Sequence, residues 1–72
     1  MKWADFLTKL KDFGAKITKN GSYVNIELMV ASEKKHTTEH VIDHEGSVDN
    51  VDVTRILNRF ELDERLFRDH HV

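Results

Sequence analysis

Residues 23–30 carry the pattern that most constrains what this chain can fold into. Apolar side chains occupy every second position there, at Val24, Ile26, Leu28 and Val30. Successive side chains of a strand point to opposite faces, so the alternation is typical of a half-buried strand with one apolar face. Such a face has to be covered, and the rest of the chain is expected to supply the cover.

Two other segments show the three- and four-residue spacing of apolar side chains that is typical of amphipathic helices. The first spans about residues 3–13 and ends before Gly14, a residue type that favours the left-handed conformation after a helix. The second begins after Asp49 or Asn50, either of which is a suitable N-cap. Its apolar pattern continues past Asp63, which is a suitable cap for a short final helix.

Two further strands are expected, one on each side of the alternating segment. Residues 15–19 lead into Asn20-Gly21, a pair of residue types that favours a type I′ hairpin turn. Residues 36–43 are rich in Thr, Val and Ile, which are typical of strands. Because hairpins join antiparallel strands, the sequence predicts one α+β domain over residues 1–72. Its order is helix–strand–strand–strand–helix, with a three-stranded antiparallel sheet, both helices on one face, and room for a short C-terminal helix.

A tight second hairpin turn about Glu33 and Lys34 predicts which residues oppose each other across the sheet. The opposed pairs in that register are Ile26–Val41, Tyr23–His44, Glu27–His40 and Ala31–His36. All but the first of these pairs lie on the face without helices. A slip of one residue would instead bury Ile42 and His40 and expose Val41.

Three histidines, His36, His40 and His44, share the open face of the third strand in this register. Strand residues four apart are separated by about 13 Å, whereas zinc–nitrogen bonds are about 2 Å long. The sequence therefore predicts a polar face there, and neither a metal site nor a cofactor.

Composition favours a cytoplasmic protein with no membrane partner. The chain contains no Cys, which fits a reducing compartment. No apolar run reaches the length of a signal peptide or a membrane span. The formal net charge of −2 argues against a basic footprint for nucleic acid over the whole chain. Every Lys falls within residues 1–35, however, and most of the acidic residues fall within residues 36–72.

The predicted element order and the length resemble the double-stranded-RNA-binding-domain fold. Within that fold the chain is most similar to the HicA toxin family of bacterial toxin–antitoxin pairs. The features that carry the resemblance are the opening helix ADFLTKLKDFG, the run Lys19-Asn20-Gly21-Ser22, the DVTRILNRFEL stretch and the trailing residues 62–67. Membership would imply a small RNA-cleaving toxin that uses no metal and is neutralised by an antitoxin.

The sequence departs from that family at its catalytic position. In the family a Gly-Ser-His run places the essential His at the start of the second strand, whereas the matching run here ends in Tyr23. A rearranged ribonuclease site would need another group able to take a proton near neutral pH. Tyr23 with His44 is the candidate catalytic pair. Asp49 and Asp52 stand where double-stranded-RNA binders place lysines, and would repel a phosphate backbone.

Three functions follow from these patterns. The favoured prediction is a binding module that has no chemistry of its own and that binds a protein (an antitoxin or a host enzyme) or RNA. Its predicted binding surface comprises Lys9, Lys16, Lys19, Tyr23, Glu27, Lys34, Lys35, His36 and His40.

The two alternatives belong to other classes. One is a small phage-type inhibitor, for example an anti-CRISPR protein, that presents carboxylates to a basic groove on a host enzyme. The acidic residues of that surface would be Glu45, Asp49, Asp52, Glu61, Asp63 and Glu64. The other alternative is a HicA-like mRNA-cleaving toxin with a rearranged site.

Overall fold

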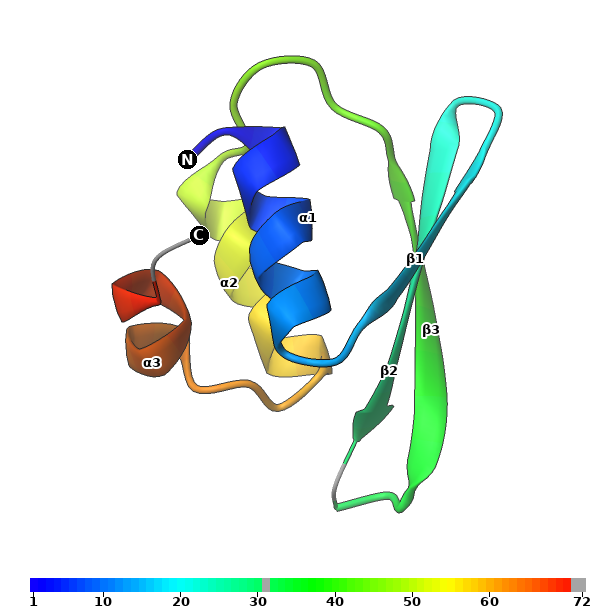
Figure 1. The fold of residues 1–72 in the computed structure, drawn as a ribbon, viewed down its shortest axis with the longest axis vertical. Coiled ribbons are helices and arrows are strands. Elements are labelled where there is room, and N and C mark those ends of the chain that lie inside the picture. The colour runs from blue at the N-terminus through cyan, green and yellow to red at the C-terminus, as the bar shows by residue number, and fades with distance from the viewer. Residues whose placement is uncertain (31, 71–72) are drawn as a thin grey trace.

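The computed structural model describes residues 1–30 and 32–70. The elements in chain order are α1 (Trp3–Asp12), β1 (Lys16–Asn20), β2 (Tyr23–Val30), β3 (Lys35–Ile42), α2 (Asn50–Arg59) and α3 (Glu64–Asp69). The strands form one antiparallel sheet in the order β1-β2-β3. Figure 1 shows α1 and α2 side by side on one face of this sheet, with its other face uncovered. The α+β class and the predicted element order are confirmed.

The first hairpin turns one residue later than its sequence predicts. Asn20 and Tyr23 are the last opposed pair, so the two-residue loop is Gly21-Ser22. Gly21 has a φ of 63°, whereas Ser22 stays outside the left-handed region. Positive φ at the first central residue alone is the geometry of a type II′ turn, which requires Gly there. The expected type I′ turn centred on Asn20-Gly21 is therefore wrong.

The second hairpin shifts the expected pairing by two residues. Its last pair is Val30–Lys35, and Lys34 in the loop adopts a φ of 54°. Val24, rather than Ile26, consequently opposes Val41. A shift of two residues leaves every side chain on the same face, because the side-chain period of a strand is two. The expected faces are therefore right although the opposed pairs are wrong.

The core lies between the sheet and the two longer helices. Val24, Ile26 and Val30 of β2 are fully buried, and Leu28 is 6% exposed. The apolar stripes of the helices meet them. The stripe residues are Trp3, Phe6, Leu7 and Leu10 of α1, and Val53, Ile56 and Leu57 of α2. The predicted cover for the alternating strand is thus supplied by both helices.

The segment between β3 and α2 is tied to the start of α1. Trp3 donates its backbone N–H to the carbonyl of Gly46 at 2.8 Å, and Val48 donates to the carbonyl of Met1 at 2.9 Å. The Trp3 side chain also donates through Nε1 to the Asp43 carboxylate at 2.8 Å. These bonds fix the position of residues 43–48 beside the helix.

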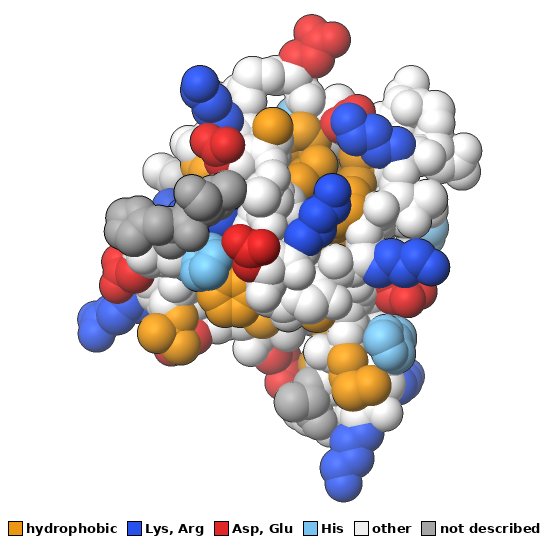
Figure 2. All heavy atoms as spheres, viewed as in Figure 1, with side chains coloured by type: hydrophobic (Ala, Val, Ile, Leu, Met, Phe, Trp, Pro, Cys, Tyr) orange, Lys and Arg blue, Asp and Glu red, His pale blue; other side chains and the backbone are white. Residues whose placement is uncertain are grey.

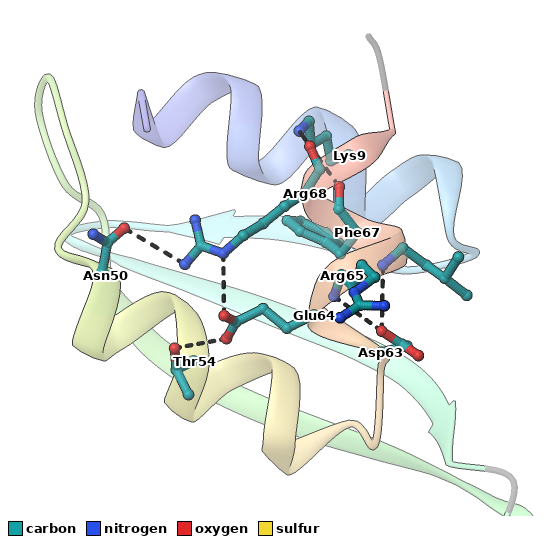
Figure 3. A network of polar contacts seen from close by, with 9 residues as sticks. Lys9, Asn50, Thr54, Asp63, Glu64, Arg65, Phe67 and Arg68 are labelled. Atoms are coloured by element: carbon teal, nitrogen blue, oxygen red, sulfur yellow. Dashed lines mark hydrogen bonds and ion pairs between the residues drawn. The ribbon is translucent and has the colours of Figure 1, made fainter.

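Helix α3 lies across α1 and α2 on their side away from the sheet, as Figures 1 and 3 show. Asp63 is its N-cap, as the sequence predicts, and accepts from the backbone N–H groups of Arg65 and Leu66. Phe67 is fully buried and packs edge-on against Phe6, with ring centroids 5.4 Å apart. The short C-terminal helix therefore completes the core.

Among residues 1–30 and 32–70, no helix combines the length and the apolar character needed to cross a membrane.

Candidate binding surface

One face of the sheet, the open face, is not covered by helices (Figure 1). It is formed by Lys16, Thr18, Asn20, Tyr23, Asn25, Glu27, Met29, His36, Thr38, His40 and Ile42. Tyr23, Met29 and Ile42 are 54%, 53% and 61% exposed, so three large apolar side chains lie in solvent on a single surface. Tyr23 and Ile42 are directly opposed across β2 and β3 and form an apolar pair at one end.

Polar side chains occupy the middle of the open face. His36 lies 3.7 Å from the Glu27 carboxylate, and the His40 ring nitrogen Nδ1 hydrogen-bonds the side-chain oxygen of Asn25. The expected opposition of Glu27 and His40 is wrong, because the shifted register places Thr38 opposite Glu27. His36 opposes Met29, and Ala31, its expected partner, lies outside the described residues.

His44 does not reach the open face. Ile42 is the last residue of β3, and it takes the position opposite Tyr23 that was expected for His44. The His44 ring instead packs edge-on against Trp3 on the helix side of the sheet, with centroids 4.8 Å apart. The expected Tyr23–His44 pair is therefore wrong, and Tyr23 has an aliphatic neighbour where a proton acceptor was expected.

The lysines predicted to bind a ligand fall in different places. Lys9 points at the end of α3, where its ammonium lies 3.4 and 3.3 Å from the carbonyl oxygens of Phe67 and Arg68 (Figure 3). A cation at the C-terminal end of a helix complements the partial negative charge there. Lys9 therefore stabilises the attachment of α3.

The other predicted lysines are also dispersed. Lys16 lies on the open face opposite Glu27, and Lys19 lies 3.7 Å from Asp43 on the helix side. Lys34 and Lys35 lie at the tip of the second hairpin. The lysines of the predicted binding surface therefore do not gather on one face of the molecule.

A groove of about 620 Å³ opens between α1 and β1, and the sequence did not indicate it. Its apolar floor includes Trp3, Leu7 and Ile17, and its rim carries Lys2 and Lys11. Figure 2 shows apolar atoms exposed beside basic side chains on this side of the molecule. The groove joins residues far apart in the chain, so no local pattern could have predicted it.

Several acidic residues of the predicted inhibitory surface have structural partners. Asp63 caps α3 through its side chain, whereas Asp49 occupies the N-cap position of α2 without a side-chain capping bond. Asp52 lies 3.9 Å from Arg55, and the Ser32 hydroxyl donates to Glu61. Glu45 is exposed.

Glu64 is the most connected of these carboxylates. It accepts a hydrogen bond from the Thr54 hydroxyl at 2.7 Å and from the Arg68 guanidinium at 3.2 Å (Figure 3). The Thr54 bond, followed by the Arg68 bond, lowers the pKa of Glu64 below its usual value of 4.5. The carboxylate therefore links α2 to α3.

The histidines and carboxylates of the described residues do not gather into a metal site. No group of three or more potential ligands converges within residues 1–30 and 32–70. His36 and His40 each contact one polar side chain on β2 and leave the remaining ring atoms facing solvent. The open face therefore carries hydrogen-bonding groups and exposed apolar side chains.

Comparisons with protein-family models, with curated proteins and with solved structures found no match for this chain. The resemblance to the HicA family stays a prediction.

Proposed function

We propose that this protein is a binding module without chemistry of its own, and that it recognises a protein partner through the open face of its sheet. The observation that carries this proposal is the exposure of Tyr23, Met29 and Ile42 on one surface, each above one half. The other face of the same strands is closed by helices. Tyr23 and Ile42 are directly opposed on the uncovered face, and such a contiguous apolar pair is typical of an interaction site. Met29 adds a third exposed apolar side chain towards the other end of the same face.

The composition of the open face favours a protein over RNA. Tyr and Met are enriched at the centres of protein interfaces, and charged residues are depleted there. The acidic and basic side chains of this face, apart from its histidines, are Lys16 and Glu27, which oppose each other. A surface for RNA would instead combine several cations with aromatic stacking. Lys16 is the only lysine among the open-face residues, so this face does not supply those cations.

The element order supports a resemblance to the double-stranded-RNA-binding-domain fold and to HicA proteins. Under this proposal that fold serves as a scaffold for recognition. The partner would be an antitoxin-like protein or a host enzyme, and the protein would act in the cytoplasm. The separation of Tyr23 from His44 removes the geometric reason for a rearranged ribonuclease site.

The test compares two double variants that each remove exposed apolar side chains. Tyr23→Ser with Ile42→Thr alters the open face. Val51→Ser with Leu66→Ser alters the helix side, where the two residues are 78% and 63% exposed. Each variant and the parent would be immobilised and exposed to lysate of the native host, and the captured proteins and RNAs would be identified. The partner would then be purified and titrated by calorimetry.

The proposal expects a protein that the parent and the helix-side variant capture and that the open-face variant loses. Removing two exposed apolar anchors is expected to weaken the calorimetric affinity by more than tenfold, because a few such residues carry most of the binding energy. Equal binding by the open-face variant would contradict the proposal. If the parent captures RNA and moderate salt releases that RNA, the RNA alternative would be favoured.

A further inference from the structure

The outer edge of β3 is an unpaired strand edge. β3 is the last strand in the order β1-β2-β3, so within the described residues it pairs with β2 alone. Its register against β2 is continuous from Tyr23–Ile42 to Val30–Lys35, without a bulge. The chain contains no Pro. β3 carries the charged residues Lys35 and Glu39 on its helix side, but a long, regular edge without a bulge or Pro is still a template for pairing with another strand.

The hydrogen-bond pattern shows which residues of β3 face that edge. Asp43 donates its backbone N–H to the carbonyl of Ser22 at 2.9 Å. Backbone groups alternate in direction along an antiparallel strand, so the odd-numbered residues of β3 bond to β2. The even-numbered residues therefore direct their N–H and C=O groups outward. These residues are His36, Thr38 and His40, and all three are exposed.

A hollow of about 270 Å³ lies beside the same edge, between β3 and α2. Its lining includes Val41 of β3, together with Asp52, Arg55 and Ile56 of α2. A strand added to β3 would point alternate side chains towards the helices. A residue opposite Val41 would thus enter this hollow.

We infer that the occupant of the β3 edge is a second copy of this chain, paired antiparallel about a two-fold axis at Thr38. Residues 35–41 of each copy would form the new ladder. Thr38 would oppose its own copy, His36 would oppose His40, and Lys35 would oppose Val41. The result is a continuous six-stranded sheet whose two open faces lie on the same side. This inference does not depend on the proposed function.

Charge complementarity selects this register. Lys35 of the second copy would lie diagonally beside Glu39 and would extend into the hollow towards Asp52. Arg59 of the first copy already binds Glu39 at 2.8 Å, and Arg55 lies 3.9 Å from Asp52, so the lysine would share both carboxylates with arginines. An axis at residue 39 would place two Glu39 side chains directly opposite each other, which is unfavourable. A two-fold axis at residue 37 would pair only residues 35–39 of the two copies, because β3 begins at Lys35. The axis at Thr38 gives a longer ladder with no like-charged carboxylates or lysines opposed.

Cysteine substitution tests the pairing directly, because the chain has no Cys of its own. Hydrogen-bonded partners across antiparallel strands have Cα atoms about 5.5 Å apart, which is within the range that a disulfide bridges. Thr38→Cys should therefore form a disulfide-linked dimer in a glutathione redox buffer. Thr18→Cys is the matched control, since Thr18 is exposed on the same face but lies on β1. Equal or faster cross-linking at residue 18 would overturn the assignment.

The parent provides a second measurement that requires no cross-link. A single strand pair makes a small interface, so sedimentation equilibrium should cover concentrations from about 10 μM to about 1 mM. The mass is expected to rise towards twice the 8.4 kDa of one chain. Thr38→Lys would oppose two ammonium groups across the axis and should keep the mass at one chain, whereas Thr38→Val should leave the dimer intact. A parent that stays monomeric at about 1 mM would overturn the inference and would leave the edge to a strand from another protein.

Discussion

The two faces of the β-sheet are made by the same strands and differ in almost every physical respect. Towards the helices, β2 presents Val24, Ile26 and Val30 with no exposed surface. Away from them it presents Tyr23 and Met29, each more than half exposed. Neighbouring residues of one strand therefore serve different purposes. The covered face supplies the free energy of folding, whereas the open face is available for recognition.

The largest expected effect belongs to the covered face. Ile26→Ala removes a fully buried side chain between the sheet and the helices. Such truncations lower the free energy of unfolding by about 2–5 kcal/mol, a large part of the roughly 5–15 kcal/mol of a typical domain. Denaturant titration followed by circular dichroism measures the loss. If Ile26→Ala lowered the free energy of unfolding no more than truncation of Tyr23 does, the distinction between the two faces would be contradicted.

A smaller effect is expected from the outer layer of the cover. Asp63→Ala removes the side-chain cap of α3 and should cost about 1 kcal/mol, as is usual for N-caps. The open face should stay unaltered, so the amide chemical shifts of Asn25 and Thr38 should match those of the parent. Asp63→Asn retains an oxygen acceptor and is the matched control. Shifts spread over the open-face amides would show that the two sides of the sheet are coupled.

The open face is expected to tolerate substitution. Tyr23→Ser should change the free energy of unfolding by roughly 0.5 kcal/mol or less, the usual range for exposed positions. The same variant should weaken partner binding, because it removes an exposed aromatic ring. Denaturant titration and calorimetry on one preparation measure both quantities. A large loss of stability without a loss of affinity would reverse the roles assigned to the faces.

The smallest effect concerns pH. The pKa of Glu64 is lowered in the folded protein, so its bonds to Thr54 and Arg68 stabilise the fold fully above its unfolded pKa, near 4.5. That contribution is lost as the pH falls through the lower, folded-state pKa. Stability measured between pH 7 and pH 3 should therefore decline less in Glu64→Gln than in the parent. Equal declines in both proteins would contradict this role of the carboxylate.

The sequence predicted the faces of the sheet better than it predicted contacts across it. Apolar alternation in residues 23–30 assigned each side chain to a face, and a register shift of two residues leaves that assignment intact. The turn before β3 lacks a Gly or Asn-Gly signal and contains Lys34 in a left-handed conformation. Its length could not be deduced from residue types, and the opposed pairs were wrong for that reason.

Contacts between distant parts of the chain were likewise beyond local patterns. His44 was expected to continue β3, but Trp3 binds the adjacent Asp43 and packs against the His44 ring. Lys9 was expected on a binding surface, yet it meets the carbonyl groups that end α3. Both positions are set by where α1 and α3 come to lie, which depends on the whole core. The helix spacing, by contrast, is local. α1 was found within one residue of its expected bounds, and α2 begins directly after Asp49, one of its two expected N-caps.

Because Trp3 is buried, its fluorescence reports whether the protein is folded. It is the only tryptophan in the chain, is 3% exposed, and holds Asp43 through its indole nitrogen. Its emission should shift to the red when the helices leave the sheet, since the ring then enters water. A ligand that docks on the far side of the sheet does not touch this ring. The tryptophan emission will therefore change on unfolding and stay constant when a partner binds the open face. The two events can thus be distinguished in unlabelled protein.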